Sequence, residues 1–203
     1  MLYQIHRYPA DLIDVVRIRG GRRVLIRPVL PQDESVTSAF FGSLPARARY
    51  NRFLAPVRDL APELVKRFTS IDYASHLALL AEVFSGGRET VVAEARYARL
   101  GDQSVAEFAV SVAEDWQGRG LASLLLAKLL SRAAGAGIER IVGETLATNA
   151  KMLHLARKAG FVATPSTNVR GVVLLEKRLD AGAHVADCGA SGEGEILSAC
   201  AQK

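Results

Sequence analysis

The stretch from Gln117 to Ser123, QGRGLAS, has the residue types of an anion-binding turn. Two glycines flank Arg119, and a leucine-rich run that favours a helix begins directly after the second one. Glycines let the backbone turn sharply and approach a ligand closely. The first N–H groups of a helix lack partners and carry partial positive charge, to which the arginine adds a formal charge. The stretch predicts an anion site, typically for a diphosphate, with an ordinary strand-to-helix turn as the alternative.

Two common phosphate-binding motifs do not fit this stretch. A P-loop requires a lysine followed by serine or threonine after its last glycine, whereas this chain has Leu121 and Ala122. A dinucleotide-binding fingerprint requires a third glycine where this chain has Ser123, and it normally stands in the first strand–helix unit. The stretch here follows several expected strands. Both of these nucleotide-binding classes are therefore disfavoured.

The strand expected over residues 106–112 leads into this turn. Its alternate side chains point to opposite faces of a sheet, so Phe108 and Val110 share an apolar face and Glu107 lies on the other. The helix after the turn has leucines at helical spacing, at positions 121, 124, 125, 129 and 130. We expect the apolar strand face to pack against helices. The face that carries Glu107 is left for another role.

The rest of the sequence divides into alternating helix and strand patterns. Gly20 and Gly21 join two short strands within residues 15–29 as a hairpin. Helices are expected over residues 33–44, 47–53, 62–70, 121–134 and 149–159, and further strands over 76–84, 89–98, 105–112, 140–145, 161–163 and 171–176. This order indicates a mixed α/β (α+β) domain over 22–179, preceded by a lead-in with one hairpin strand over 1–21. A flexible acidic tail rich in Gly and Ala is expected over 180–203.

Composition narrows the class of protein. A length of 203 residues, with 49% hydrophobic and 23% charged residues, suits one folded domain. We expect a cytoplasmic protein without membrane contact, because no signal peptide is evident and the most apolar run, residues 121–130, is too short to span a bilayer. Both cysteines, Cys188 and Cys200, lie in the tail, so no disulfide framework is expected. The net charge of +5 suits an anionic ligand, but scattered arginines without interleaved aromatics argue against nucleic acid.

Two motifs resemble the GNAT superfamily of N-acetyltransferases. QGRGLA fits the Q/R-x-x-G-x-G/A loop that binds the diphosphate of acetyl-CoA in that superfamily, and NAKMLHLARKAGF, residues 149–161, resembles its Asn-initiated helix that ends in Gly-Phe. Further segments resemble the acetyltransferase domain of Pat-type bacterial protein lysine acetyltransferases: YPADL, RIRGGRRVLIRPVLPQDE, RYNRF, IDYASHLALLAE, AEFAVSV and DWQGRGLASLLL. The resemblance covers about residues 22–179.

The resemblance implies a GNAT fold, in which helices flank a central mixed, mostly antiparallel sheet that is splayed between its fourth and fifth strands. It implies acetyl-CoA as the acyl donor and no metal. The donor site would comprise the splayed backbone, the diphosphate loop and the asparagine of the second motif: Val110, Ser111, Val112, Gln117, Gly118, Arg119, Gly120, Leu121, Ala122, Ser123 and Asn149.

Acyl transfer to an amine requires the amine in its neutral form. A free lysine has a pKa near 10.4, so under ~0.1% of it is neutral at pH 7, and a positioned carboxylate can accept the proton. We expect Glu107 to be this base, because the resemblance also places a glutamate at this strand position. Glu144, at the end of the next strand, is the rival. A solvent-facing or structural role is the alternative for both.

The acceptor is not fixed by these motifs. The resemblance implies a primary amine, such as a protein lysine; a small-molecule amine is the alternative, and a homodimer remains open. Asp72 and Tyr73, before the strand at residue 76, are expected on the acceptor side, although helix capping or packing explains them equally well. Many members have a tyrosine that protonates the departing thiolate where this chain has Ala156, which keeps a non-catalytic acyl-CoA sensor as a further alternative. His154, nearby on the same helix, is more typical of a surface residue.

Overall fold

The computed structural model describes residues 8–85, 87–101 and 104–179. The strands are β1 (Asp14–Arg17), β2 (Arg23–Pro28), β3 (His76–Ser85), β4 (Arg88–Arg99), β5 (Val105–Val112), β6 (Arg140–Leu146), β7 (Val162–Pro165) and β8 (Val172–Arg178). The α-helices are α1 (Glu34–Ser43), α2 (Ala46–Phe53), α3 (Pro62–Thr69), α4 (Leu121–Gly135) and α5 (Ala150–Lys158). Short 3-10 turns are η2 (Ala10–Leu12), η3 (Pro31–Asp33) and η4 (Glu114–Trp116). Every helix and strand expected within these residues is present, with small shifts at the ends.

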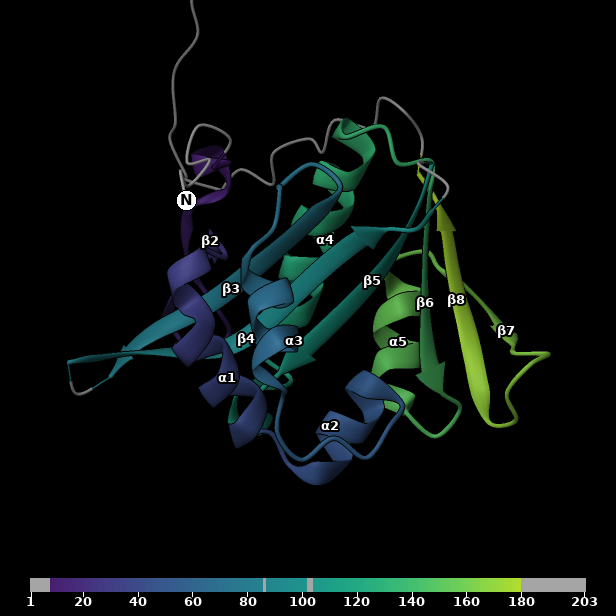
Figure 1. Ribbon diagram of the computed structural model, residues 1–203, viewed down its shortest axis with the longest axis horizontal. Helices are drawn as coiled ribbons and strands as arrows, with labels where there is room; N and C mark the ends of the chain where they lie inside the picture. Colours follow the sequence, from purple (N-terminus) through teal and green to yellow (C-terminus); the bar gives the residue numbers. More distant parts are fainter. Residues whose placement is uncertain (1–7, 86, 102–103, 180–203) are drawn as a thin grey trace, which may run out of the picture.

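The strands form a single eight-stranded sheet in the order β1-β2-β3-β4-β5-β6-β8-β7 (Figure 1). Neighbouring strands are antiparallel except β5 and β6, which are parallel. The expected hairpin joins β1 to β2, and Gly20 and Gly21 take the positive φ angles of 93° and 77° that its turn requires. The expected mixed, mostly antiparallel sheet is confirmed. β1, from the lead-in, forms an edge of this same sheet.

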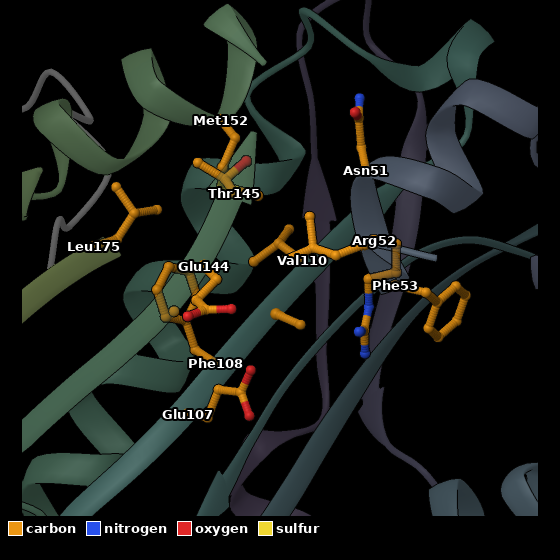
Figure 2. Close-up of a pocket in the computed structure, with 13 residues that line it drawn as sticks. Asn51, Arg52, Phe53, Glu107, Phe108, Val110, Glu144, Thr145, Met152 and Leu175 are labelled. Atoms are coloured by element: carbon orange, nitrogen blue, oxygen red, sulfur yellow. The ribbon is translucent and has the colours of Figure 1, made fainter. Parts of the chain in front are cut away.

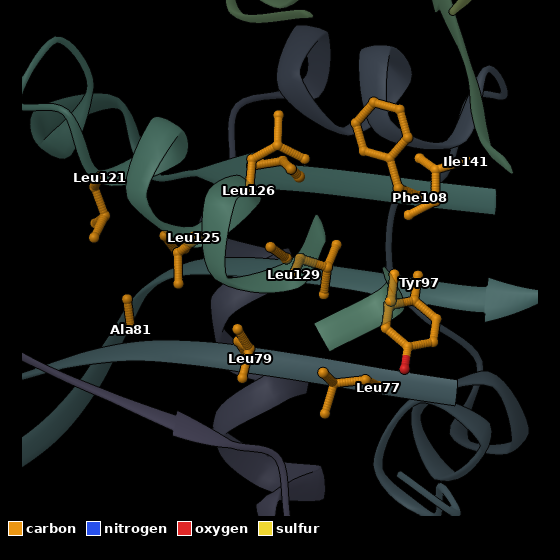
Figure 3. Close-up of a cluster of buried hydrophobic side chains, with 14 of the residues drawn as sticks. Leu77, Leu79, Ala81, Tyr97, Phe108, Leu121, Leu125, Leu126, Leu129 and Ile141 are labelled. Carbon is orange, nitrogen blue, oxygen red and sulfur yellow. The ribbon is translucent and has the colours of Figure 1, made fainter. Parts of the chain in front are cut away.

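Helices cover both faces of the sheet. In Figure 1, α1, α2 and α3 lie in front of it, whereas α4 and α5 lie behind. Of the leucines of α4 that the spacing placed on its inner side, three are buried in one cluster with Leu77, Tyr97 and Phe108 of the strands: Leu121, Leu125 and Leu129 (Figure 3). Leu124 and Leu130 are only partly buried, and Leu126, which the spacing did not select, is buried. A second buried cluster, with Phe41 of α1 and Val65 of α3, covers the other face. The two faces of β5 therefore divide as its alternation predicts.

The sheet opens between β5 and β6, the fourth and fifth strands counted from β2. They pair only at their first residues, from Val105 opposite Arg140 to Glu107 opposite Val142, and each then continues without the other. Gly143, the residue after the last pair, lies close against Phe108: a Cβ there would lie 2.7 Å from Cε1 of Phe108 and 3.2 Å from the Phe108 carbonyl oxygen, so a side chain at this position would not fit without a shift. The Phe108 ring is itself held against Phe161, with ring centroids 4.8 Å apart. The expected splay is confirmed.

Some expectations concern residues outside the described ranges. The tail over 180–203, with Cys188 and Cys200, lies there, as do residues 1–7 of the lead-in. Among the described helices, none is both long and apolar enough to cross a membrane.

Candidate active site

A cavity of about 320 Å³ lies where β5 and β6 separate. Three segments and two single residues line it: the end of α2, the middle of β5, the second half of β6, Met152 of α5 and Leu175 of β8. Figure 2 shows the side chains of Glu107 and Glu144 entering this space from the two diverging strands, with Arg52 of α2 on the opposite side. The tertiary fold therefore places the two carboxylates named from the sequence in one cavity.

Glu107 and Glu144 are both exposed. Within the described residues, neither carboxylate takes part in a hydrogen bond or an ion pair. Glu107 stands at the last paired position of β5, where the strands begin to diverge, and Glu144 stands two residues after the last paired position of β6. A carboxylate that is free and opens into a cavity can accept a proton from a bound group.

The predicted diphosphate loop lies between η4 and α4. Gly118 and Gly120 have φ angles of 74° and 88°, a conformation that favours glycine, and Gly120 is the N-cap of α4. No side chain caps the first N–H groups of α4. A Cβ at either glycine would meet nothing within 4 Å, so space beside the loop is open. The loop thus has the free donors and the room that a diphosphate needs.

Comparison with known proteins identifies the family of this chain. Residues 47–161 match the model of the acetyltransferase (GNAT) family. Acetyltransferase PA5475 of Pseudomonas aeruginosa is 33% identical over 148 residues, which cover 73% of this chain and 80% of the relative. The chain belongs to the GNAT acetyltransferase family. It is accordingly an acyltransferase with Pat-type relatives.

Other relatives of this GNAT protein support the same assignment. Acetyltransferase Pat of Mycolicibacterium smegmatis is 32% identical over 148 residues, which cover 72% of this chain but only 44% of that relative's length. The GNAT domain of S. lividans PAT superposes with a TM-score of 0.77 at 33% identity, covering 85% of this chain and 99% of that domain. YncA of Salmonella typhimurium, solved with its cofactor acetyl-CoA, shares the fold at 19% identity, with a TM-score of 0.61 and coverage of 81% and 99%.

In this GNAT domain, the splay exposes the backbone of β5 where the donor site was predicted. The N–H of Ala113 bonds to Val92 in β4 at 2.9 Å, so the alternate residues Val110 and Val112 direct their backbone groups away from β4, toward β6. β6 does not pair with them. Ser111 points to the face of Glu107 and is 8% exposed. The N–H groups of Val110 and Val112 thus face the opening as potential donors, whereas the carbonyl of Val112 already accepts from the side chain of Gln117.

Gln117 joins this opening to α5. Its Nε2 donates to the carbonyl of Val112 at 3.0 Å, and its Oε1 accepts from Nζ of Lys151 at 2.6 Å. Arg119 partly turns back on its own segment, since its Nε donates to the Asp115 carbonyl at 3.1 Å. The predicted roles of Gln117 and Arg119 toward a ligand stay predictions; in the free protein both side chains hold the loop in shape.

Asn149 initiates α5 as the motif suggested. Its Oδ1 accepts from the N–H of Met152 at 3.3 Å, and its Nδ2 donates to Oγ1 of Thr145 at 3.0 Å. Its predicted donor contact stays a prediction. Thr145, which the sequence did not single out, is 1% exposed and lines the cavity. Because its oxygen accepts from Asn149, its own O–H remains to be donated.

Arg52 is a second cavity-lining residue that the sequence analysis did not single out. Its guanidinium carbon lies 5.9, 5.0 and 5.7 Å from the ring centroids of Phe41, Phe53 and Phe68. Its Nε is buried and has no hydrogen-bond partner among the described residues. Burial lowers the pKa of Arg52, although the carboxylates of Glu94 and Glu107 oppose this change. The polar sequence around Arg52 is typical of a short solvent-exposed helix, so it gives no local signal that this arginine packs among phenyl rings.

A buried polar group lies beneath the cavity, on the same face of the sheet as Glu107. Glu94 and Arg96 of β4 form an ion pair there, and the Arg96 guanidinium stacks on Phe68, 3.7 Å from its ring centroid. Burial, reinforced by the charge of Arg96, lowers the pKa of His76 to about 4. Neutral His76 can therefore accept from Arg96 through Nε2, which lies 3.2 Å from Nη1. This group links β3 and β4 on the face of the sheet that carries Glu107.

Asp72 and Tyr73 lie apart from the cavity lining. The Asp72 carboxylate accepts from the backbone N–H groups of Ala74, Ser75 and His76. The Tyr73 hydroxyl donates to the carbonyl of Val29 at 2.8 Å, and burial raises its pKa to about 12. Both side chains thus hold the turn before β3, and their predicted contact with an acceptor stays a prediction.

The family's tyrosine position is occupied by Ala156, which is 1% exposed in α5. His154 is exposed on the same helix and is not among the cavity-lining residues. No tyrosine is among the described residues that line the cavity. In the described part of the chain, no cluster of three or more His, Cys, Asp or Glu side chains could hold a metal ion.

Proposed function

We propose that this protein transfers an acetyl group from acetyl-CoA to a primary amine, the side chain of a protein lysine. The observation that carries the proposal is the position of Glu107, an unpaired carboxylate in the cavity at the point where β5 and β6 separate. The diphosphate loop at α4 fits the donor, because it offers uncapped N–H groups beside open space. The N–H groups of Val110 and Val112 fit it as well, because they face the opening where β6 does not pair with β5. Acetyl-CoA supplies the activated acetyl group when bound.

The chain's own residues then perform two tasks. Glu107 accepts a proton from the acceptor ammonium, directly or through water, so that the neutral nitrogen can attack. A backbone N–H of Val110 or Val112 donates to the carbonyl oxygen on which negative charge develops. Glu144 is the second carboxylate within the same cavity and contributes charge that favours a cationic acceptor.

The departing thiolate needs less help than the amine. A coenzyme A thiol is acidic enough to leave without full protonation, so the alanine at position 156 is compatible with transfer. That same alanine favours the second candidate function, a sensor that binds acyl-CoA without turnover. The sensor predicts acetyl-CoA affinity with no acetyl transfer to any amine.

Labelled acetyl-CoA separates these functions. The purified protein is incubated with it and with an acyl-CoA synthetase, with total cell-extract proteins, or with polyamines, amino acids and aminoglycosides. Labelled lysine in a protein supports the proposal. Label in small amines alone would replace it with the small-molecule reaction, and tight binding without any labelled product would leave the sensor.

A further inference from the structure

A second hollow adjoins the cavity, and we call it the α2 groove. It has a volume of about 500 Å³ and lies between α2 with the segment after it, on one side, and the end of β6 with Thr148 on the other. Asn51 lines both hollows. Leu146 of the α2 groove directly follows Thr145 of the cavity. A group bound in the α2 groove would therefore be next to one bound beside Glu107.

The charge of the α2 groove is opposite to that of the cavity. Arg47 and Arg58 line it and are exposed, and within the described residues neither forms an ion pair or a hydrogen bond. Arg49 serves the scaffold, since its Nε donates to the Val57 carbonyl at 3.0 Å and holds the segment after α2 in place. No acidic residue is among the described residues that line the groove. The guanidinium groups of Arg47 and Arg58 are thus available to pair with anionic groups of a ligand.

The α2 groove lies on the acceptor side of the sheet. α2 covers the face that carries Glu107, whereas the predicted diphosphate loop begins α4 on the other face (Figure 1). None of the residues of the predicted diphosphate loop, 117–123, is among the described residues that line the groove. We propose that the α2 groove binds an acidic segment of the acceptor polypeptide, adjacent to the lysine that enters the cavity. This inference rests on the proposed lysine acetylation.

The chemistry of the α2 groove favours a polypeptide over the other acceptor classes. Its positive charge repels polyamines and aminoglycosides, which are cationic acceptors that the alternative small-molecule reaction would use. Tyr50, 42% exposed and also lining the groove, offers a ring against which an extended chain can pack. Exposed ion pairs are individually weak, so each cation should improve affinity by up to about fivefold. Together they give a preference for sequence around the lysine.

The test compares short peptides that carry one lysine flanked by glutamates or by glutamines. Transfer to each is measured as kcat/KM, and binding is measured by fluorescence anisotropy with the same peptides carrying a pre-acetylated lysine. The proteins are the wild type, the double variant Arg47→Ser/Arg58→Ser, and a control double variant Arg23→Ser/Arg88→Ser. The control removes the same charge from exposed positions on β2 and at the start of β4 that line neither hollow.

We expect the wild type and the control to prefer the glutamate peptide by roughly three- to tenfold at low salt. In Arg47→Ser/Arg58→Ser the ratio of kcat/KM for the glutamate peptide to that for the glutamine peptide should fall toward one, while the affinity for acetyl-CoA stays that of the wild type.

Equal kcat/KM and equal affinity of the wild type for the two peptides would overturn the inference and leave the proposed lysine acetylation standing. A loss of acetyl-CoA affinity in the double variant would also overturn it, because the groove would then bind the donor. So would stronger competition by a single-stranded oligonucleotide than by the glutamate peptide. Binding of the glutamate peptide without any transfer would support the groove and count against the proposed reaction.

Discussion

Replacing Glu107 with glutamine tests the chemistry of the cavity directly. The side chain keeps its shape but can no longer accept a proton. Glu107 is exposed and, within the described residues, makes no hydrogen bond or ion pair. The substitution should therefore change the melting temperature by no more than a few degrees, because exposed residues without specific partners contribute little to stability. Any large loss of activity must then come from the reaction.

The size of that loss follows from the acceptor. A lysine with a pKa near 10.4 is neutral only about one time in 10³ at pH 7.4, so a variant without its base depends on this small fraction. We expect kcat to fall by about 10³ at pH 7.4, within the range of ~10²–10⁴ typical of general bases. Each unit of higher pH should recover about tenfold, until the two profiles meet near pH 10. The affinity for acetyl-CoA should barely change.

The assay is kcat against pH for one lysine peptide, with Glu144→Gln as the matched control. Glu144 lines the same cavity and its substitution removes the same charge, so a general electrostatic effect would appear in both variants. If Glu107 is the base, the steep pH-dependent loss of kcat should appear in Glu107→Gln alone. Parallel profiles of similar height for wild type and Glu107→Gln would refute it. The deficit in Glu144→Gln instead would assign the base to Glu144.

Three further predictions concern the loop, the splay and acid stability. Gly120→Asp places a carboxylate at the N-terminus of α4 and a side chain at a φ of 88°; calorimetry should detect no acetyl-CoA binding, whereas Gly120→Ala, which carries only about 1–2 kcal/mol of backbone strain, should still bind. Unchanged affinity of the folded aspartate variant would mean that the diphosphate lies elsewhere. Gly143→Ala should destabilise the fold by about 1–3 kcal/mol in urea, because its Cβ would lie 2.7 Å from Phe108, and an unchanged unfolding midpoint would contradict that crowding. The pKa of His76 is about 4 when folded and 6.5 ordinarily, so the unfolded chain takes up the proton first and stability is lost as the pH falls from 6.5 toward 4, by up to about 3 kcal/mol. His76→Gln should flatten urea-derived stability across that window, and an equally steep wild-type and variant dependence would show that another group is responsible.

Local sequence patterns were sufficient to predict the helices and strands and the separate parts of the candidate site. Alternation along residues 105–112 assigned Phe108 to the buried face and Glu107 to the other, and both assignments hold in the sheet. Leucine spacing after Gly120 predicted the buried side of α4. These features depend on neighbours within one element, whose geometry repeats every 2 or about 3.6 residues, so a single strand or helix carries the signal by itself.

Contacts between distant segments could not be predicted from these local patterns. Arg52 lies against Phe41 of α1 and Phe68 of α3 as well as against its chain neighbour Phe53, and nothing in residues 47–53 marks the two distant contacts. Tyr73 donates its hydroxyl to the carbonyl of Val29, which lies 44 positions earlier in the chain. Gln117 likewise meets Lys151, which lies 34 positions away in the chain. Such pairings depend on how complete elements pack, which no short window of sequence contains.

The sequence by itself determined the type and order of the elements, the glycine loop before α4, and the face of the strand on which Glu107 lies, because each is encoded by spacing within one element. Tertiary structure decided that β5 and β6 stop pairing after Glu107 and Val142. It also decided that Glu144 and Arg52 share a cavity with Glu107, and that Asn51 lines both this cavity and the basic α2 groove. These outcomes arise where strands that are separated in the chain become parallel neighbours, since only the packed sheet brings their ends together.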